Sequence, residues 1–244
     1  MKAATRVILL LKDGADDGGF ASSIANALQP NPNSNLRRLE ESFELSLEKY
    51  GIKDHKASGN MIHFLNINGV SEVSVLLLEH TEPPLLACAL NEVLVSFLGG
   101  TSSDIPNLVV PFLVEASKLK LENKNAISSY EVSLYGLEFG QLHNLTHALA
   151  SKIQKAPQSL QIYHEQLACL LHLVRVLDIP ILVLVGQHTR HSYSNNLEQY
   201  PEVIYGIGEL LAEYSSLCFL RERVVWNPPK SSKASKEPWH ALYG

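Results

Sequence analysis

Short aliphatic runs, separated by segments with helical periodicity, limit this chain to few folds. Such runs occur at Val7–Leu11, Val73–Leu78, Leu108–Val114 and Ile179–Val185. A strand that is buried on both faces needs apolar residues at nearly every position, whereas a strand with one face in water alternates. The runs therefore predict buried strands. Together with the helical segments they predict an α/β fold, with a mostly parallel or mixed sheet covered by helices.

Apolar residues spaced three and four positions apart mark the helical segments. They predict helices at 35–50, 86–97, 142–153, 160–177 and 203–214, of which 160–177 is the longest. Further strands are predicted at 61–67, 131–139 and 217–226. Gly51 follows the first of these helices, and Gly99-Gly100 follow the second, in the positions where glycine commonly ends a helix.

The length of 244 residues fits one large domain with a tail. The polar stretch 114–130 suggests a loop or an insertion, and no linker precedes residue 226. Residues 226–244, WNPPKSSKASKEPWHALYG, are mostly Pro, Lys and Ser before an apolar end. Such a composition buries too little surface to offset backbone ordering. We therefore expect an α/β domain at 1–225 and a disordered tail at 226–244.

Charge and cysteine content narrow the class of protein. The net charge is −5 and no basic helix is evident, so nucleic acid is not an expected partner. No run approaches the length of a membrane span. Cys88, Cys169 and Cys218 are odd in number and form no C-x-x-C pair, which favours reduced thiols in the cytosol or nucleus.

Two short motifs resemble binding sites but lack required residues. The segment Gly14–Gly19 follows the first strand, yet it lacks the glycine and lysine pattern of a phosphate loop and carries two Asp residues. His143 and His147 have the zinc-protease spacing, but Asn144 stands where the catalytic Glu belongs. A solvated helix face explains this pair better, so no cofactor or metal is expected.

The segment Gln187–His191 follows the last aliphatic run. Ligands of open α/β sheets bind at the carboxyl ends of strands, so His188, Arg190 and His191 could hold an anion there. A small-molecule enzyme, a hydrolase or a transferase, is one alternative for this chain. It would need these residues to converge with Ser103 or Asp104 in a deep pocket. A polar surface loop is the simpler interpretation.

The most specific feature is the last triplet, Leu242-Tyr243-Gly244. It offers an aliphatic side chain, a phenol that can donate a hydrogen bond, and a carboxylate. Capture of a terminal carboxylate by a basic pocket or a backbone nest is a known mode of recognition. If the eighteen residues 226–243 behave as a random chain, they span on the order of 20–25 Å.

This triplet resembles the hydrophobic-tyrosine-any (HbYX) motif of proteasome activators and proteasome assembly chaperones. The segment Leu173–Val185 is similar to the late helix-to-strand step of the proteasome assembly chaperone 1 family, and residues 187–214 also fit. The second chaperone of the pair fits less well, because its glycine-rich N-terminal segment has no counterpart here. Ring ATPases are excluded because the chain has no Walker A lysine.

The resemblance implies a non-catalytic chaperone for the 20S proteasome α-ring, acting as a heterodimer with a second assembly chaperone. It implies that Leu242 fills an apolar part of a pocket between α-subunits, that Tyr243 forms a hydrogen bond, and that the Gly244 carboxylate meets a pocket lysine. We add Trp239 as a contact outside the pocket. A further alternative is a scaffold protein whose tail binds another carboxylate-reading domain.

Overall fold

The structure is a computed structural model that describes residues 4–14, 19–98, 105–120, 134–188 and 199–225. The helices are α1 Phe20–Ala27, α2 Leu85–Leu98, α3 Asn144–Ala150, α4 Glu165–Leu177 and α5 Gln199–Ser215. The strands are β1 Arg6–Leu11, β2 Leu28–Gln29, β3 Arg37–Ser46, β4 Lys56–Leu65, β5 Ser71–Leu78, β6 Asn107–Glu115, β7 Leu119–Lys120, β8 Leu134–Phe139, β9 Gln154–Lys155, β10 Gln161–Ile162, β11 Ile181–His188 and β12 Cys218–Phe219.

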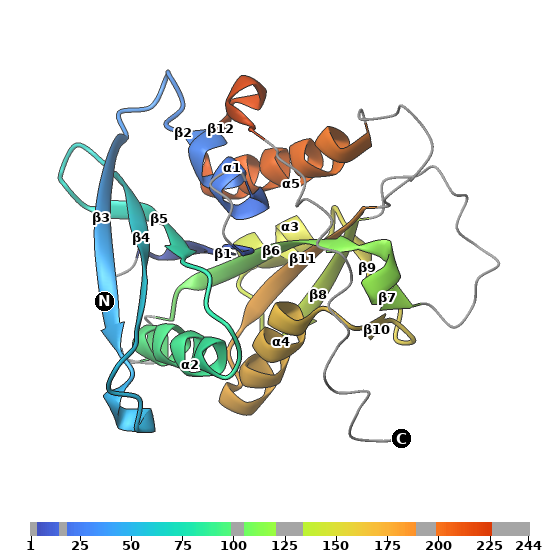
Figure 1. Cartoon of the computed structure of the whole chain (residues 1–244). Helices are drawn as coiled ribbons and strands as arrows, with labels where there is room; N and C mark the ends of the chain where they lie inside the picture. Colours follow the sequence, from blue (N-terminus) through green and yellow to red (C-terminus); the bar gives the residue numbers. More distant parts are fainter. Residues whose placement is uncertain (1–3, 15–18, 99–104, 121–133, 189–198, 226–244) are drawn as a thin grey trace.

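Eight of these strands form one mixed sheet in the order β3-β4-β5-β1-β6-β11-β8-β9. The central strands β5, β1, β6 and β11 are parallel, β3 and β4 are antiparallel additions on one side, and β8 runs antiparallel to β11. Helices α2 and α4 cover one face, and α1, α3 and α5 cover the other (Figure 1). The predicted single α/β domain with a helix-covered mixed sheet is confirmed.

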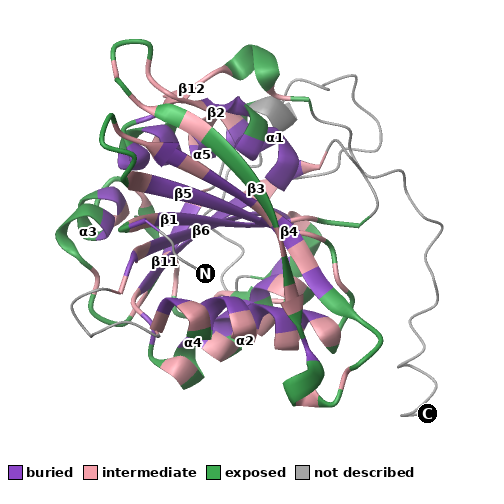
Figure 2. Cartoon of the chain, turned by 90° about the vertical axis from the view of Figure 1, so that its left-hand side faces the viewer, coloured by how far each residue is buried: buried purple, intermediate pink, exposed green. Residues whose placement is uncertain are grey.

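The aliphatic runs are the core of the sheet because both of its faces are covered. In β1, Val7, Leu9 and Leu11 pack in the layer under α2 and α4, while Ile8 and Leu10 pack under α1 and α5. Every residue from Val7 to Leu11 is at most 6% exposed. Figure 2 shows this central band of buried strands. No helix in the part of the chain that the structure describes is long and apolar enough to span a membrane.

The prediction of a helix at 35–50 is wrong. Residues 37–46 form β3, the outermost strand, and only Glu48–Tyr50 make a 3₁₀ turn, which Gly51 ends in the left-handed conformation with φ of 80°. Leu39 and Phe43 are four residues apart, which places them on one side of either a helix or a strand. Leu45, two positions after Phe43, fits only the strand, and it packs beside Phe43 on the core.

Other helices and strands differ from the prediction in where they begin or end. Helix α4 begins at Glu165 because residues 161–162 pair with β7 as the short strand β10. Consequently α5, with 17 residues, is longer than α4, with 13. The strand predicted at 217–226 is reduced to Cys218–Phe219, which pairs with β2 before the 3₁₀ turn Arg221–Arg223.

Candidate functional site

The residues of the terminal motif, Trp239, Leu242, Tyr243 and Gly244, lie outside the described residues, as do Arg190, His191, Ser103 and Asp104. The expected tail boundary at 226 is likewise not described. The structure does describe residues that adjoin these segments. They lie at the two ends of the parallel strands.

His143 and His147 lie on an exposed face of α3. His143 precedes the first turn, and its carbonyl accepts the His147 amide hydrogen bond at 2.9 Å. Both residues are exposed. Within the described ranges, no group of three or more His, Cys, Asp or Glu side chains could hold a metal ion.

Several titratable side chains lie at the carboxyl ends of the four parallel strands. Lys12, just after β1, forms a 2.6 Å ion pair with Glu79, just after β5. Gln166, in the first turn of α4, donates from its side-chain nitrogen to the Lys12 carbonyl at 3.1 Å. His188 ends β11 opposite Glu115, the last residue of β6.

His164 is the best-defined group at this edge. It is the N-cap of α4, and its Nδ1 atom accepts a hydrogen bond from the Leu167 amide at 3.3 Å. Its ring packs edge-on against Phe112, with centroids 5.8 Å apart. Burial lowers the pKa of His164 to about 4, and the nearby charge of Lys118 adds to this effect. His164 is therefore a neutral imidazole at neutral pH, with Nε2–H as the remaining donor.

Asp13 adds an acid to the same edge. The residue as a whole is exposed, but packing around its carboxyl group raises the pKa, while His80 and Lys118 oppose that rise. Asp13 follows β1. The helix that comes after β1, α1, lies on one face of the sheet, whereas the helix that comes after the neighbouring strand β5, α2, lies on the other face. This is the position at which open α/β sheets form a crevice. The side chains at the carboxyl ends of these strands can donate and accept protons and hydrogen bonds.

The alternative of a small-molecule enzyme requires the His188–His191 segment to meet Ser103 or Asp104. The described residues next to these two segments lie far apart. Ile105, bonded to Asp104, is two residues before the amino end of β6. His188 is at the carboxyl end of β11, and the parallel register pairs it with Glu115 at the far end of β6. At about 3.3 Å per residue, the eight steps from Asn107 to Glu115 place the two ends of β6 roughly 26 Å apart. The two segments that such an enzyme site would combine therefore adjoin opposite ends of the parallel strands.

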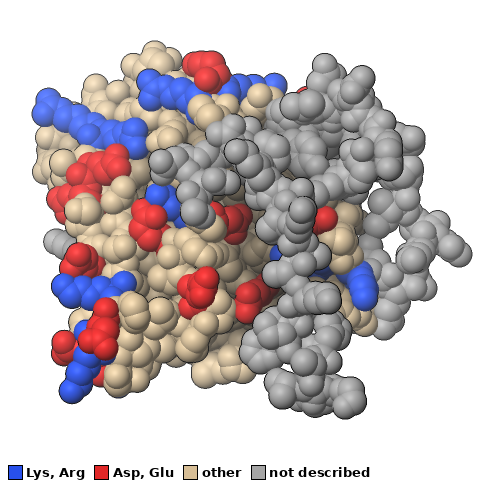
Figure 3. Space-filling view, viewed as in Figure 1, with Lys and Arg blue, Asp and Glu red and all other residues tan. Residues whose placement is uncertain are grey.

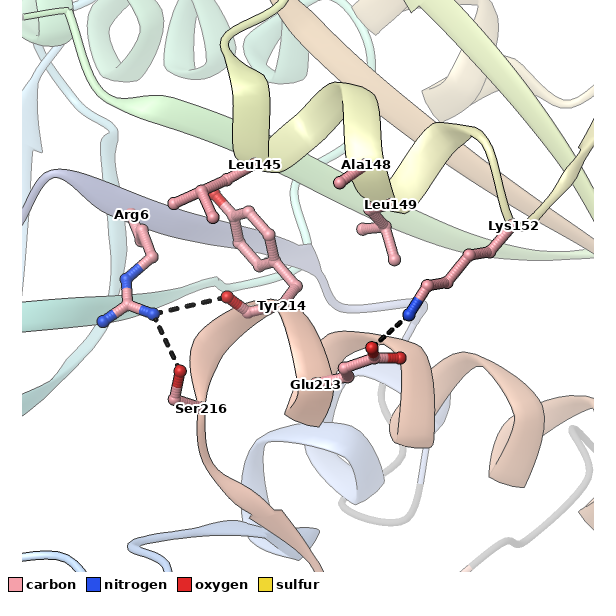
Figure 4. A pocket seen from close by; sticks show the side chains of 8 residues that line it. All are labelled: Arg6, Leu145, Ala148, Leu149, Lys152, Glu213, Tyr214 and Ser216. Carbon is pink, nitrogen blue, oxygen red and sulfur yellow. Dashed lines mark hydrogen bonds and ion pairs between the residues drawn. The ribbon is translucent and has the colours of Figure 1, made fainter.

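A hollow of about 150 Å³ lies at the amino ends of the strands, between α3 and α5 (Figure 4). Its lining comprises Arg6, Leu145, Ala148, Leu149, Lys152, Glu213, Tyr214 and Ser216. Arg6 donates to the Tyr214 carbonyl at 3.4 Å and to the Ser216 hydroxyl at 3.2 Å, and Lys152 pairs with Glu213. The charged groups that line the hollow thus bind other groups of the same chain. The Tyr214 hydroxyl also donates to the Asn107 carbonyl at 2.6 Å.

Replacing Tyr214 by Phe is expected to lower the free energy of unfolding by about 1–2 kcal/mol, because the Asn107 carbonyl loses its buried donor. Urea denaturation followed by circular dichroism measures this change. Tyr163 is the matched control, since it is 55% exposed and its hydroxyl donates to the exposed side chain of Gln161 at 2.9 Å. Tyr163→Phe should change stability by less than about 0.5 kcal/mol. Equal effects of the two substitutions would contradict the structural role of Tyr214.

His164 and the hollow were not predicted from the sequence. Histidine is not a preferred N-cap residue, and the helical pattern around Leu160 concealed where α4 begins. Arg6 and Tyr214 are 208 residues apart, and no motif joins them. His188 was predicted in a segment that follows a strand ending at Val185, whereas the structure extends that strand and makes His188 the last residue of β11.

Known proteins provide both a family match and similar folds. A family model described as a domain of unknown function, DUF7894, matches residues 1–244. No curated protein matches the chain in sequence. A solved structure from Corynebacterium glutamicum, described as a protein of unknown function, is 12% identical, with a TM-score of 0.52 over 92% of this chain and 79% of that chain.

Two other solved structures carry names that concern the proteasome. Pyrococcus furiosus PbaB, an archaeal proteasome activator, is 9% identical, with a TM-score of 0.48 over 92% of this chain and 89% of that chain. A Mycobacterium tuberculosis proteasome-assembly chaperone homologue is 12% identical, with a TM-score of 0.44 over 85% of this chain and 84% of that chain. The likeness to the Corynebacterium structure shows a shared fold.

Proposed function

The chain belongs to the family of the domain of unknown function DUF7894, and we propose that it is a non-catalytic chaperone that promotes assembly of the 20S proteasome α-ring. The observation that carries the proposal is the triplet Leu242-Tyr243-Gly244. The fold supports it, because a single α/β domain is what the chaperone resemblance implies. The proposal does not depend on the two likenesses to proteasome-related structures.

Each residue of the triplet has its own task in this proposal. Leu242 fills the apolar part of a pocket between α-subunits, Tyr243 donates a hydrogen bond within it, and the Gly244 carboxylate pairs with a lysine. Trp239 contacts the surface outside the pocket.

The folded domain supplies the remaining affinity. A short peptide binds weakly because its ordering entropy opposes binding. A second contact from residues 1–225 raises the effective concentration of the tail at its pocket. In the proposed complex, the chain forms a heterodimer with a second assembly chaperone while it holds α-subunits.

Deletion of Leu242–Gly244 is expected to weaken retention of α-subunits by at least about tenfold, because both the terminal charge and the apolar anchor are lost. The full chain and the deletion variant are immobilised, and bound α-subunits are quantified from an extract and from reconstituted α-rings. Tyr243→Phe should show an intermediate loss.

Addition of one alanine after Gly244 is the matched control for the carboxylate. It preserves all three side chains but moves the charge by one residue, and we expect it to weaken retention as the deletion does. Unchanged retention of α-subunits by the deletion variant would overturn the docking role of the tail. Absence of α-subunits from the material retained by the full chain would overturn the proposed function itself.

A further inference from the structure

Strand β3 is a long free edge of the sheet. It spans ten residues and pairs with β4 along one side only, and no strand of the described ranges pairs with its other side. No residue of β3 is fully buried, so both of its faces reach solvent (Figure 2). An unpaired edge presents a row of backbone donors and acceptors to another strand.

The charges along this edge are arranged so that two copies attract each other. Residues 37–41 are Arg, Arg, Leu, Glu and Glu. When two such strands pair antiparallel about Leu39, Arg37 lies opposite Glu41 of the second copy, and Arg38 lies opposite Glu40 of the second copy. The two-fold axis repeats each pair, which makes four pairs of opposite charge. Figure 3 shows basic and acidic side chains along the side of the molecule where Figure 1 places β3 and β4.

Other symmetric registers are less favourable. Centring the pair on Glu40 or on Glu41 places like charges directly opposite each other, which destabilises antiparallel strands. Centring it on Leu39 places an aliphatic side chain, 44% exposed in the single chain, against its own copy. Residues two apart share one face of a strand, so Arg37, Leu39 and Glu41 meet on one face and Arg38 and Glu40 on the other.

The edge is also held rigid before any partner arrives. The turn after β3 is tied to α2, because the Tyr50 hydroxyl donates to Glu92 at 2.6 Å and Lys49 pairs with the same carboxylate. Phe43 covers Gly59 of β4, which holds the two strands in register. A preformed edge loses little conformational entropy on pairing.

Exposed apolar residues continue the surface beyond the strand. Ile67 and Val70, in the turn after β4, are 75% and 59% exposed. The turn adjoins the start of β3, because Leu65 pairs with Arg37. Phe43 and Leu45 pack on the core of their own chain, so Leu39 is the apolar residue of the paired segment itself. The contact would combine backbone pairing, charge pairs and the apolar area around Leu39.

We propose that two copies of this chain associate by antiparallel pairing of their β3 edges, centred on Leu39, to form one continuous sheet. Charges on edge strands commonly prevent such pairing through repulsion. Here the order of the charges makes the same edge self-complementary. The proposal is independent of the role in proteasome assembly, and a contact with a second chaperone would use another surface.

Charge reversal in two halves tests the proposal on the purified full chain. One variant carries Arg37→Glu and Arg38→Glu, and the other carries Glu40→Arg and Glu41→Arg. Each variant alone places four like pairs at the interface, so its dissociation constant should rise at least about tenfold above that of the natural chain. Mixed together, the two variants restore all four opposite pairs and should form a one-to-one dimer.

Sedimentation velocity over a concentration series measures these equilibria, and circular dichroism verifies that each variant is folded. Glu44→Lys is the matched control: it reverses a charge on β3 outside the paired segment and breaks only the exposed contact with Lys56. This control should dimerise as the natural chain does. A natural chain that stays monomeric at all concentrations, equal dimerisation of the separate variants, or a mixture that does not pair would each overturn the proposal.

Discussion

Acidification from pH 7 to pH 4 is expected to lower the free energy of unfolding by roughly 3 kcal/mol through His164 alone. The folded chain holds the imidazole neutral down to a pKa of about 4, because its burial against Phe112 penalises the charged form and Lys118 repels it. In the unfolded chain the pKa returns to the ordinary value of 6.5. His188 contributes to the same shift.

The direction follows from proton binding. Between pH 6.5 and about 4 the unfolded chain binds a proton on His164 that the folded chain does not bind. Stability therefore rises with pH through this window. The contribution of His164 is fully present above pH 6.5, and it is lost as the pH falls toward 4. Each unit of pKa difference corresponds to about 1.4 kcal/mol.

His164→Asn isolates this effect. Asparagine is a good N-cap residue, so its side-chain oxygen can replace Nδ1 as the acceptor for the Leu167 amide while the titration is removed. We expect the variant to lose roughly 3 kcal/mol less than the natural chain between pH 7 and pH 4, measured by urea denaturation at each pH. His172→Asn, at an exposed position on the same helix, is the matched control for replacing a histidine of α4 by asparagine. A His164→Asn profile parallel to that of the natural chain would contradict the assignment.

The parallel centre of the sheet was predictable from the sequence because burial on both faces leaves a local signal. In β1, the odd-numbered and the even-numbered residues are both apolar, because the two sets pack in different layers of the core. The order of the strands has no such local signal. That β1 lies between β5 and β6, rather than next to the strand that follows it in the chain, depends on crossover connections and on the packing of α2.

Edge strands were harder to predict because their side chains are only partly buried. The spacing of Leu39 and Phe43 fits a helix and a strand equally, and the pairing of β3 with β4 decided between them. The candidate sites show the same limit. His188 was predictable just after an aliphatic run, whereas the pKa of His164 is lowered by burial beside Phe112 and by the charges of Lys118 and His188, all of which are distant in sequence.

Gly59→Ala is expected to lower the free energy of unfolding by about 2–4 kcal/mol. Gly59 is buried in β4, between Phe43 of β3 and the backbone of β5. An added Cβ would lie 2.6 Å from the Cζ atom of Phe43 and closer still to the Leu77 carbonyl oxygen. The phenyl ring can rotate away, but the Leu77 carbonyl belongs to the backbone of the central sheet. The methyl group must therefore separate β4 from β5 or shift their register.

Gly136→Ala in β8 is the matched control for this substitution. It is also a buried glycine within a strand, but its added Cβ would meet its nearest neighbour, a methyl carbon of Leu182, at an ordinary 3.7 Å. We expect this variant to equal or exceed the natural stability by up to about 1 kcal/mol, since alanine lowers the entropy of the unfolded chain. In the double variant Phe43→Ala and Gly59→Ala, only the ring clash is removed, so most of the loss should remain. Full recovery in that variant, measured by urea denaturation, would show that Phe43 rather than the Leu77 carbonyl sets the constraint.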